Sequence, residues 1–185
     1  GFYLLDREKL NDIYRLTVDE FGYAVTNMLN VYPDTIPDWL AEWIPEEGGY
    51  FVGNVSPGRM DWRFFAQGNL LAVVFGLARP EQARSLMTLY ESRWSELMGE
   101  TPVKICYPAL ENEEWRMVTG ADPKNKPWSY HNGGNWPCLL WAFTASAIKA
   151  NRSDLAEKAL AKSLERLNKN KWPEYFDGRR GQLVG

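Results

Sequence analysis

Two stretches of the chain are apolar at almost every position, and each predicts a buried helix. The first covers residues 70–78, and the second begins at Leu139 and extends through Ile148. Because a helix that is apolar all round must be covered on every side, both are expected in the interior. Each is followed by a segment, at residues 83–97 and 155–167, in which apolar residues recur every three or four positions. That spacing predicts an amphipathic helix with one face toward water.

The four predicted helices form two copies of one unit. Arg79-Pro80 ends the first apolar stretch, and residues 151–154 supply a break and an N-cap before the last helix. A Gly-Asn pair opens each apolar helix, and the two pairs, Gly68-Asn69 and Gly134-Asn135, lie 66 residues apart. The unit is therefore a loop, a buried helix, a short turn and an amphipathic helix. The inward face of the last helix is expected to consist of Leu155, Ala159, Leu160, Leu164 and Leu167.

Shorter elements are predicted elsewhere. Residues 6–16 and 36–44 fit short helices, the second with a proline in its first turn. Residues 47–54 fit a turn and a short strand, and residues 60–65 an extended segment. A tryptophan among the charges of residues 113–116 favours a partly buried hairpin over a solvated charge run. No strand is long enough to build a sheet-based core.

The repeated unit predicts an all-α fold in which an inner ring of helices lies inside an outer ring, an α/α toroid. The chain reads as one continuous piece of such a domain, without an internal boundary. The loops before the inner helices then gather at one end, and three qualify: residues 60–65, 124–137 and 171–178. A plain helical-repeat scaffold is the alternative, although its loops need not be so aromatic.

Composition narrows the functional classes. A chain of 185 residues with a net charge of -3 and no run of Lys or Arg offers no surface for nucleic acid. The longest apolar stretch is too short to cross a membrane. Cys106 and Cys138 have no metal-ligand spacing, and buried free thiols are favoured over a disulfide, which indicates a reducing, intracellular setting. The first residue is Gly1 and no signal-peptide pattern follows, so we expect a piece of a longer polypeptide.

The aromatic content of 14% is unusual and concentrates in the three loops. Flat aromatic faces beside amides and charges are typical of sites that bind sugars. His131, the single histidine, is a weak candidate for a general base or metal ligand because no second histidine accompanies it. It fits a hydrogen-bond donor to a sugar hydroxyl in a pocket lined by tryptophan, or a residue that stabilises its own loop.

Cleavage of a glycosidic bond requires two carboxyl groups. Glu174 stands out because Trp172 and Tyr175 flank it, and apolar surroundings raise the pKa of a carboxyl group. An ordinary loop carboxylate is the alternative for Glu174, and a salt bridge to Arg59 or Arg63 is the alternative for Asp61. The carboxylates in or near the loops are Asp61, Glu113, Glu114, Glu174 and Asp177.

Long motifs of the chain closely resemble the alkaline/neutral invertases of plants and cyanobacteria, glycoside hydrolase family 100. The motifs are NDIYRLTVDEFGYAVTNMLNVYPDTIPDWL, MDWRFFAQGNLLAV, KICYPALENEEWRMVTGADPKNKPWSYHNGGNWPCLLW and NKWPEYFDGRRGQLVG, which together extend almost from end to end. The departures are small: Trp62 stands where the family usually has Phe, and Gly58-Arg59 replaces a small residue followed by His or a similar residue. The resemblance implies an (α/α)6 barrel of which this chain supplies roughly half.

The resemblance also implies a function. Members of this family are intracellular, often oligomeric, need no cofactor, and hydrolyse sucrose to glucose and fructose. In the W-P-E-Y motif, Glu174 corresponds to the general base of an inverting mechanism, in which the two carboxyl groups lie roughly 6.5–9.5 Å apart. The motif positions expected to line the sugar pocket are Asp61, Arg63, Trp128, His131, Asn132 and Trp136.

The general-acid aspartate of the family lies upstream of the region that this chain matches. The resemblance therefore implies an active parent protein and an inactive isolated segment. Two other readings stay open, a non-catalytic sugar-binding or scaffold segment and a different α/α-barrel glycosidase or epimerase. An epimerase is the weaker of these, because proton transfer on both faces of a sugar calls for more than one histidine.

Overall fold

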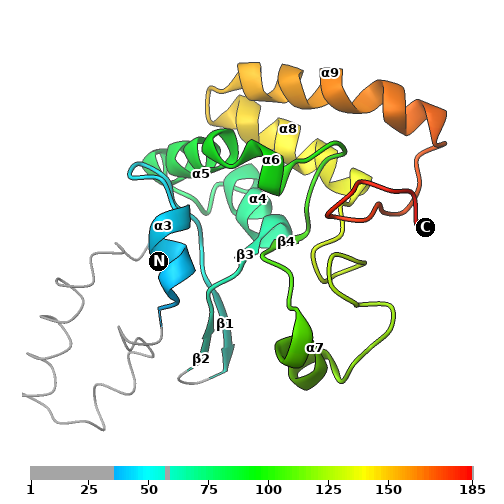
Figure 1. Cartoon of the computed structure of the whole chain (residues 1–185). Coiled ribbons are helices and arrows are strands. Elements are labelled where there is room, and N and C mark those ends of the chain that lie inside the picture. The colour runs from blue at the N-terminus through cyan, green and yellow to red at the C-terminus, as the bar shows by residue number, and fades with distance from the viewer. Residues whose placement is uncertain (1–35, 57–58, 185) are drawn as a thin grey trace, which may run out of the picture.

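The computed structural model describes residues 36–56 and 59–184, and this part of the chain is rich in helix (Figure 1). The predicted helix over residues 6–16 lies outside the described residues. The helices are α3 (Asp38–Trp43), α4 (Ala66–Val74), α5 (Pro80–Ser92), α6 (Trp94–Leu97), α7 (Asn112–Thr119), α8 (Leu140–Lys149) and α9 (Ser153–Lys169), with a 3-10 turn at Pro137–Leu139.

Strands are short and form two separate antiparallel pairs. In one pair, β1 (Gly53–Ser56) lies beside β2 (Arg59–Asp61), and in the other β3 (Phe64–Phe65) lies beside β4 (Cys106–Tyr107). These pairs confirm the prediction that strands do not build the core. The helices therefore carry the fold.

The two predicted units lie next to each other and run in the same direction. Ser146 of α8 donates a hydrogen bond to the carbonyl of Leu70 in α4 (3.0 Å), and one turn later Lys149 donates to the carbonyl of Val74 (2.9 Å). α8 also packs against α9, which lies across the top of the molecule in Figure 1. Arg152, before α9, forms an ion pair with Glu91 of α5 at 2.9 Å. The predicted arrangement of apolar helices beside amphipathic partners is therefore present in both units.

Aromatic rings join these units in the core. Phe64 of β3 meets Tyr90 of α5 edge to face at 5.5 Å, and Tyr90 meets Phe143 of α8 at 4.9 Å. All three side chains are fully buried. Each aromatic pair in this geometry stabilises a fold by about 0.5–1.5 kcal/mol in addition to the contribution of the apolar area that it buries.

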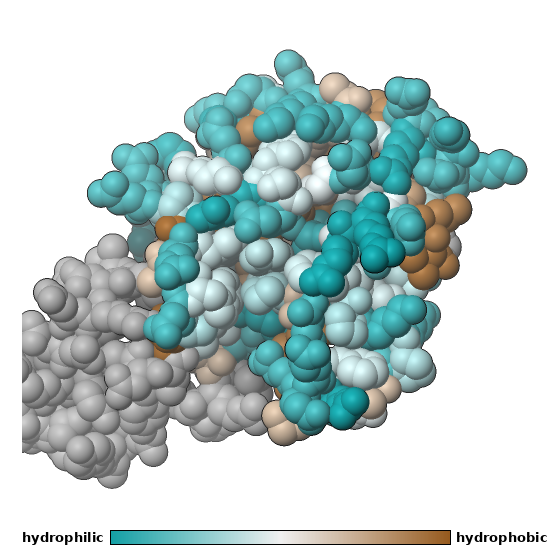
Figure 2. Space-filling view, viewed as in Figure 1, coloured by the Kyte–Doolittle hydropathy of each residue, from teal (hydrophilic) through white to brown (hydrophobic). Residues whose placement is uncertain are grey.

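The apolar helices are not covered on every side within the described residues, which differs from the prediction. Phe75 and Leu77 at the end of α4 are 69% and 79% exposed, and Trp141 and Ile148 of α8 are 57% and 58% exposed. Leu160 and Leu164 of α9, expected to face inward, are also exposed, whereas Leu155, Ala159 and Leu167 are buried. One apolar face of the α4 and α8 pair thus meets no described residue. Figure 2, seen from the same side as Figure 1, shows a mostly hydrophilic surface around α9.

The helix boundaries correct several predictions. Neither Gly-Asn pair opens a helix, because α4 already begins at Ala66, and α8 begins only at Leu140, after the second pair. The amphipathic stretch at residues 83–97 is interrupted at Arg93, between α5 and α6. The predicted break before α9 is confirmed, but no side chain caps that helix.

Residues 113–116 belong to helix α7, so the predicted hairpin is wrong. Glu113 and Glu114 lie in the first turn of α7, where negative charge suits the positive end of the helix dipole. Gly120 ends the helix in the left-handed conformation with φ of 66°. Trp115 is half-buried, as expected for its position.

Proline placement agrees with the prediction. Pro37 is the residue before α3, and Pro80 is the first residue of α5. The backbone N–H of Arg79, the residue before α5, donates to Oε1 of Gln82 at 2.9 Å, and this bond caps the N-terminus of the helix. No helix in the described part of the chain is long and apolar enough to span a membrane.

Candidate functional site

The three loops predicted to gather do lie side by side, held by short stretches of backbone pairing. β3 at the end of the first loop pairs with β4, and Lys104, just before β4, pairs with Asn135 in the second loop. Asn135 in turn pairs with Phe176 in the third loop, through N–H···O bonds of 2.9 and 2.8 Å. The gathering of the loops is therefore confirmed.

A pocket of about 730 Å³ opens where the first and second loops meet α4 and α8. Two of the predicted sugar-site residues, His131 and Trp136, lie on its wall. Most of the other lining residues are apolar, which suits the C–H faces of a sugar ring better than an ion. The remaining wall consists of Phe65, Gln67, Gly68, Leu71, Ile105, Cys138, Leu139, Trp141 and Ala142.

Rings beside the pocket form a continuous stack. The exposed His131 ring stacks on Tyr130 at 4.1 Å and on Trp136 at 5.1 Å, and Trp136 stacks on Tyr175 at 5.7 Å. The indole N–H of Trp136 donates to the carbonyl of Tyr130 at 3.0 Å, so the orientation of this ring is fixed. The stack offers a rigid aromatic surface with one imidazole at its open end.

Glu174 is not among the residues that line the pocket. Burial raises the pKa of the Cys138 thiol on the pocket wall, and the negative charge of Glu174 raises it further. The apolar enclosure expected from its neighbours is absent, because Tyr175 and Phe176 are buried while Glu174 is exposed. A carboxylate in this position is accessible to water.

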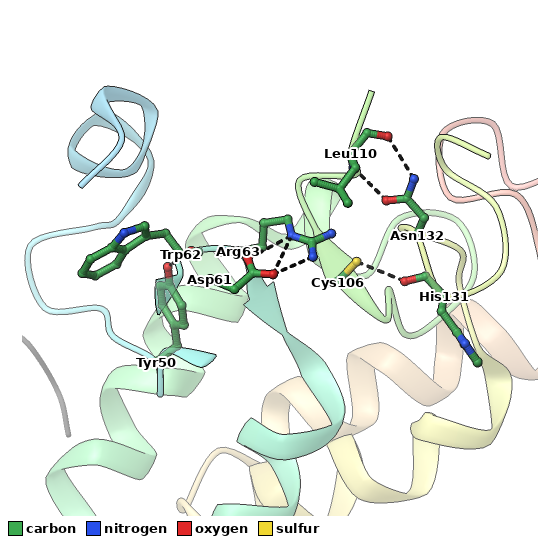
Figure 3. Close-up of polar contacts among 8 residues, drawn as sticks. All are labelled: Tyr50, Asp61, Trp62, Arg63, Cys106, Leu110, His131 and Asn132. Atoms are coloured by element: carbon green, nitrogen blue, oxygen red, sulfur yellow. Dashed lines mark hydrogen bonds and ion pairs between the residues drawn. The ribbon is translucent and has the colours of Figure 1, made fainter. Parts of the chain in front are cut away.

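Asp61 and Arg63 form a close ion pair at the end of the first loop (Figure 3). Nη2 of Arg63 lies 2.6 Å from Oδ2 of Asp61, and Nε donates to the same carboxylate at 3.0 and 3.2 Å. The salt bridge to Arg63, the alternative considered for Asp61, is thus present in the structure. The guanidinium also lies 5.0 Å from the ring of Phe65, which lines the pocket, so the pair is adjacent to the pocket without lining it.

Asn132 holds the second loop together. Its side-chain oxygen accepts from the N–H of Leu110 at 2.7 Å, and its amide nitrogen donates to the carbonyls of Leu110 and Asn125 at 2.9 and 3.1 Å (Figure 3). The side chain is buried and does not line the pocket. Its contact with a sugar stays a prediction.

Trp128 likewise lies within the loop assembly. Its indole N–H donates to Oε1 of Glu111 at 2.6 Å, and the same oxygen accepts from Arg179 at 2.9 Å. The guanidinium of Arg179 and the ammonium of Lys104 each lie 5.2 Å from the Trp128 rings. Trp128 is therefore held by a charged network beside the pocket, and its contact with a sugar also stays a prediction.

Lys104 is a buried residue that the sequence reasoning missed. It is 2% exposed, and its ammonium donates to Oδ1 of Asn135 at 3.1 Å and to the carbonyl of Gly178. Burial lowers its pKa to about 8, although Cys106 and Asp177 oppose the shift. One signal was present: in an extended segment, Lys104 shares a face with the apolar residue Cys106.

Gly178 marks a close crossing of the second and third loops. Its N–H donates to the carbonyl of Trp128 at 2.8 Å. A Cβ at this position would lie 1.6 Å from the carbonyl oxygen of Gly133, a distance that no side chain tolerates. The two loops therefore touch backbone to backbone.

The cysteines are free, as predicted, but only one is buried. Cys106 is buried and its Sγ donates to the carbonyl of His131 at 3.3 Å (Figure 3), whereas Cys138 is exposed on the pocket wall. The prediction of two buried thiols is thus wrong for Cys138, because Pro137–Leu139 forms a 3-10 turn that directs this position outward. The described residues contain no group of three His, Cys, Asp or Glu side chains able to hold a metal ion.

Comparison with known proteins agrees with the loop motifs. Residues 1–185 match the family model described as alkaline and neutral invertase. The chain is 55% identical over 185 residues to cytosolic invertase 1 of Oryza sativa subsp. japonica, covering 100% of the chain and 33% of that protein. It is 54% identical to probable alkaline/neutral invertase F of Arabidopsis thaliana and 52% identical to the mitochondrial neutral/alkaline invertase 1 of Oryza sativa subsp. japonica, covering 37% and 29% of those proteins. The chain thus spans about a third of the length of these relatives.

Proposed function

Because the chain belongs to the alkaline and neutral invertase family, we propose that the protein of which it forms part hydrolyses sucrose to glucose and fructose. The supporting observation is the pairing of Asn135 with Phe176, which joins the loop of the aromatic pocket to the loop of Glu174. A sugar bound on His131 and Trp136 is then held by the loop that pairs with the loop of Glu174, a carboxylate that water can reach.

In this proposal Glu174 is the general base that activates water, and the mechanism inverts the anomeric centre. Its exposure suits the role, since the water that it activates must reach the carboxylate. The Asp61–Arg63 pair binds sugar hydroxyls from the end of the first loop. Trp136 supplies a stacking face and His131 a hydrogen-bond donor, while Asn132 and Trp128, which do not line the pocket, hold the second loop in place through their bonds to Leu110 and Glu111.

The general acid, an aspartate, comes from a part of the protein outside these 185 residues. An (α/α)6 barrel is the architecture that we propose, in which further helices cover the apolar face exposed on α4 and α8. Phe75 and Trp141 are large apolar residues on that face, and leaving them in water is unfavourable. The isolated segment is then an incomplete barrel without hydrolytic activity.

We further propose that the protein is intracellular and forms a homo-oligomer, with no required cofactor and no nucleic-acid or membrane partner. Relatives named as cytosolic and as mitochondrial match the full length of this chain at 55% and 52% identity, which supports a location inside the cell. Fractionation of the source cells and light scattering of the purified protein test these two points.

The decisive experiment replaces Glu174 by Gln in the full-length protein. Without a base to activate water, kcat on sucrose falls by at least about 1,000-fold while sucrose binding persists. Glu157→Gln on the exposed side of α9 is the matched control and leaves kcat unchanged. Unchanged turnover in Glu174→Gln excludes Glu174 as the base.

The unaltered full-length protein separates the remaining readings. Nuclear magnetic resonance of the first-formed glucose reports its anomer, and inversion of the α-linked glucose of sucrose yields the β form. Binding without turnover identifies a non-catalytic sugar-binding protein. Faster cleavage of maltose-type sugars than of sucrose identifies a different α/α-barrel glycosidase.

A further inference from the structure

One buried ammonium group bonds to both of the loops on which the proposed reaction depends, in addition to the backbone bonds between them. Nζ of Lys104 donates to Asn135 in the loop of the aromatic pocket, at 3.1 Å, and to the carbonyl of Gly178 in the loop of Glu174. The backbone of Lys104 pairs with that of Asn135, and its N–H donates to the carbonyl of Leu97 at 2.9 Å. These bonds fix the backbone from which the side chain extends.

Burying an ammonium group at this position is energetically unfavourable. A buried charge loses its hydration, and a well-packed apolar side chain in the same place avoids that penalty. The charged and titratable groups around Lys104 only partly compensate for this loss: Cys106 and Asp177 favour its charged form, whereas Arg179, which also lies 5.2 Å from the Trp128 rings, carries the same charge. What an ammonium provides and an apolar side chain lacks is a set of directional hydrogen-bond donors.

We propose that Lys104 is a positioning residue that fixes the Glu174 segment against the pocket. Gly178 is held on both sides, through its N–H by Trp128 and through its carbonyl by Lys104. Without the second contact, the turn that follows Glu174 keeps the backbone bonds at Phe176 and Gly178 but loses the side-chain contact that fixes the carbonyl of Gly178. This inference rests on the proposed function, because it assigns the effect to the placement of the proposed base.

The test compares three variants of the full-length protein. Lys104→Met keeps the unbranched shape of the side chain, one heavy atom shorter, and removes its donors, and Lys104→Gln keeps an N–H donor without the charge. Lys162→Met is the matched control, since Lys162 is exposed on α9 and lines a cavity of about 300 Å³ next to Gly178. It removes the same charge near the same turn without touching the loop contact.

We expect Lys104→Met to lower kcat on sucrose about 10- to 100-fold, with KM changed less than about 3-fold, because a base displaced by about 1 Å loses rate more than binding. Lys104→Gln recovers part of the loss, and Lys162→Met behaves as wild type. A kcat for Lys104→Met within 2-fold of the control, or a rise in KM alone, overturns the proposal. If the Met variant does not fold, the Gln variant is judged by its own kcat, expected to fall about 3- to 10-fold.

Hydrogen exchange supplies a readout that does not need activity. In Lys104→Met, amides of residues 174–182 are expected to exchange at least about 10-fold faster than in Lys162→Met, because the turn has lost an anchor. Equal protection in the two variants overturns the proposal. If the unaltered protein does not cleave sucrose, the proposed function fails, and faster exchange still supports Lys104 as the residue that fixes this loop.

Discussion

Asn69 and Asn135 occupy the same position in the two units, yet the structure uses them differently. Asn69 lies within α4, and its side chain closes on backbone groups of the preceding loop, with bonds of 2.7 and 3.1 Å to Phe51 and 2.8 Å to the carbonyl of Phe65. Asn135 lies in an extended segment before α8. Its amide donates to the carbonyl of Thr101 at 2.8 Å and its oxygen accepts from the ammonium of Lys104.

This difference shows how the two copies of a repeated unit can take different roles. Both asparagines are buried and both anchor a loop, so the repeat conserves the anchoring role of the side chain. In the first unit every partner of Asn69 is a neutral backbone group. In the second unit the partner is an ionised side chain that reaches on to Gly178, and the anchor is extended to the loop of Glu174.

The largest effect is expected for Asn135→Ala. The substitution leaves the Thr101 carbonyl and the Lys104 ammonium each short of one partner, and a buried charge makes that loss costly. We expect the free energy of unfolding to fall by about 3 kcal/mol in urea titrations of the full-length protein. Asn170→Ala is the control, because the side chain of Asn170 makes no hydrogen bond with any residue that the structure describes. A loss no greater than that of the control means that Asn135 is not an anchor.

A smaller effect is expected for Asn69→Ala. Three hydrogen bonds are lost, but all of them are to neutral backbone groups, and no charge is stranded. The expected loss is about 2 kcal/mol in the same titrations, with kcat on sucrose unchanged. If Asn69→Ala lowers the free energy of unfolding more than Asn135→Ala does, the bond to the Lys104 ammonium does not make Asn135 the stronger anchor.

The smallest effect separates the charge itself from the hydrogen bonds. Because the pKa of Lys104 is about 8 in the folded protein and 10.5 ordinarily, the unfolded chain holds more protons between these values. Raising the pH from 7.5 to 9.5 therefore favours the folded state, by about 1–2 kcal/mol for this group alone. Lys104→Met removes that gain, while Asn69→Ala retains it. Identical pH dependence of unfolding in wild type and Lys104→Met contradicts the lowered pKa.

The sequence predicts the helices well because their signal is local. The spacing of Leu155, Ala159 and Leu167 is enough to place α9, and a proline after Arg79 is enough to start α5. The gathering of the three loops also follows from the repeat, since equivalent loops of parallel units lie at the same end. Boundaries at the Gly-Asn pairs fail, because both asparagines also bond to segments far away in the sequence, Asn69 to Phe51 and Asn135 to Thr101 and Lys104.

Contacts between distant residues are beyond what a local pattern predicts. Lys104 meets Gly178 across 74 positions of the chain, and nothing near either residue identifies the other. The site is only partly anticipated for the same reason. His131 and Trp136 reach the pocket as predicted, whereas Gln67, Cys138 and Trp141 join its wall through the packing of α4 against α8.

The crossing of Gly133 and Gly178 has a consequence for protein engineering. There is no room for even a methyl group at Gly178, because the backbones of the two loops are in direct contact. The conformation of each loop therefore depends on the presence of the other. Grafting the loop of Glu174 onto another helical scaffold then requires the glycine-rich loop of His131 to be transferred with it. The smallest part of this site that can be exchanged between proteins is therefore the pair of loops.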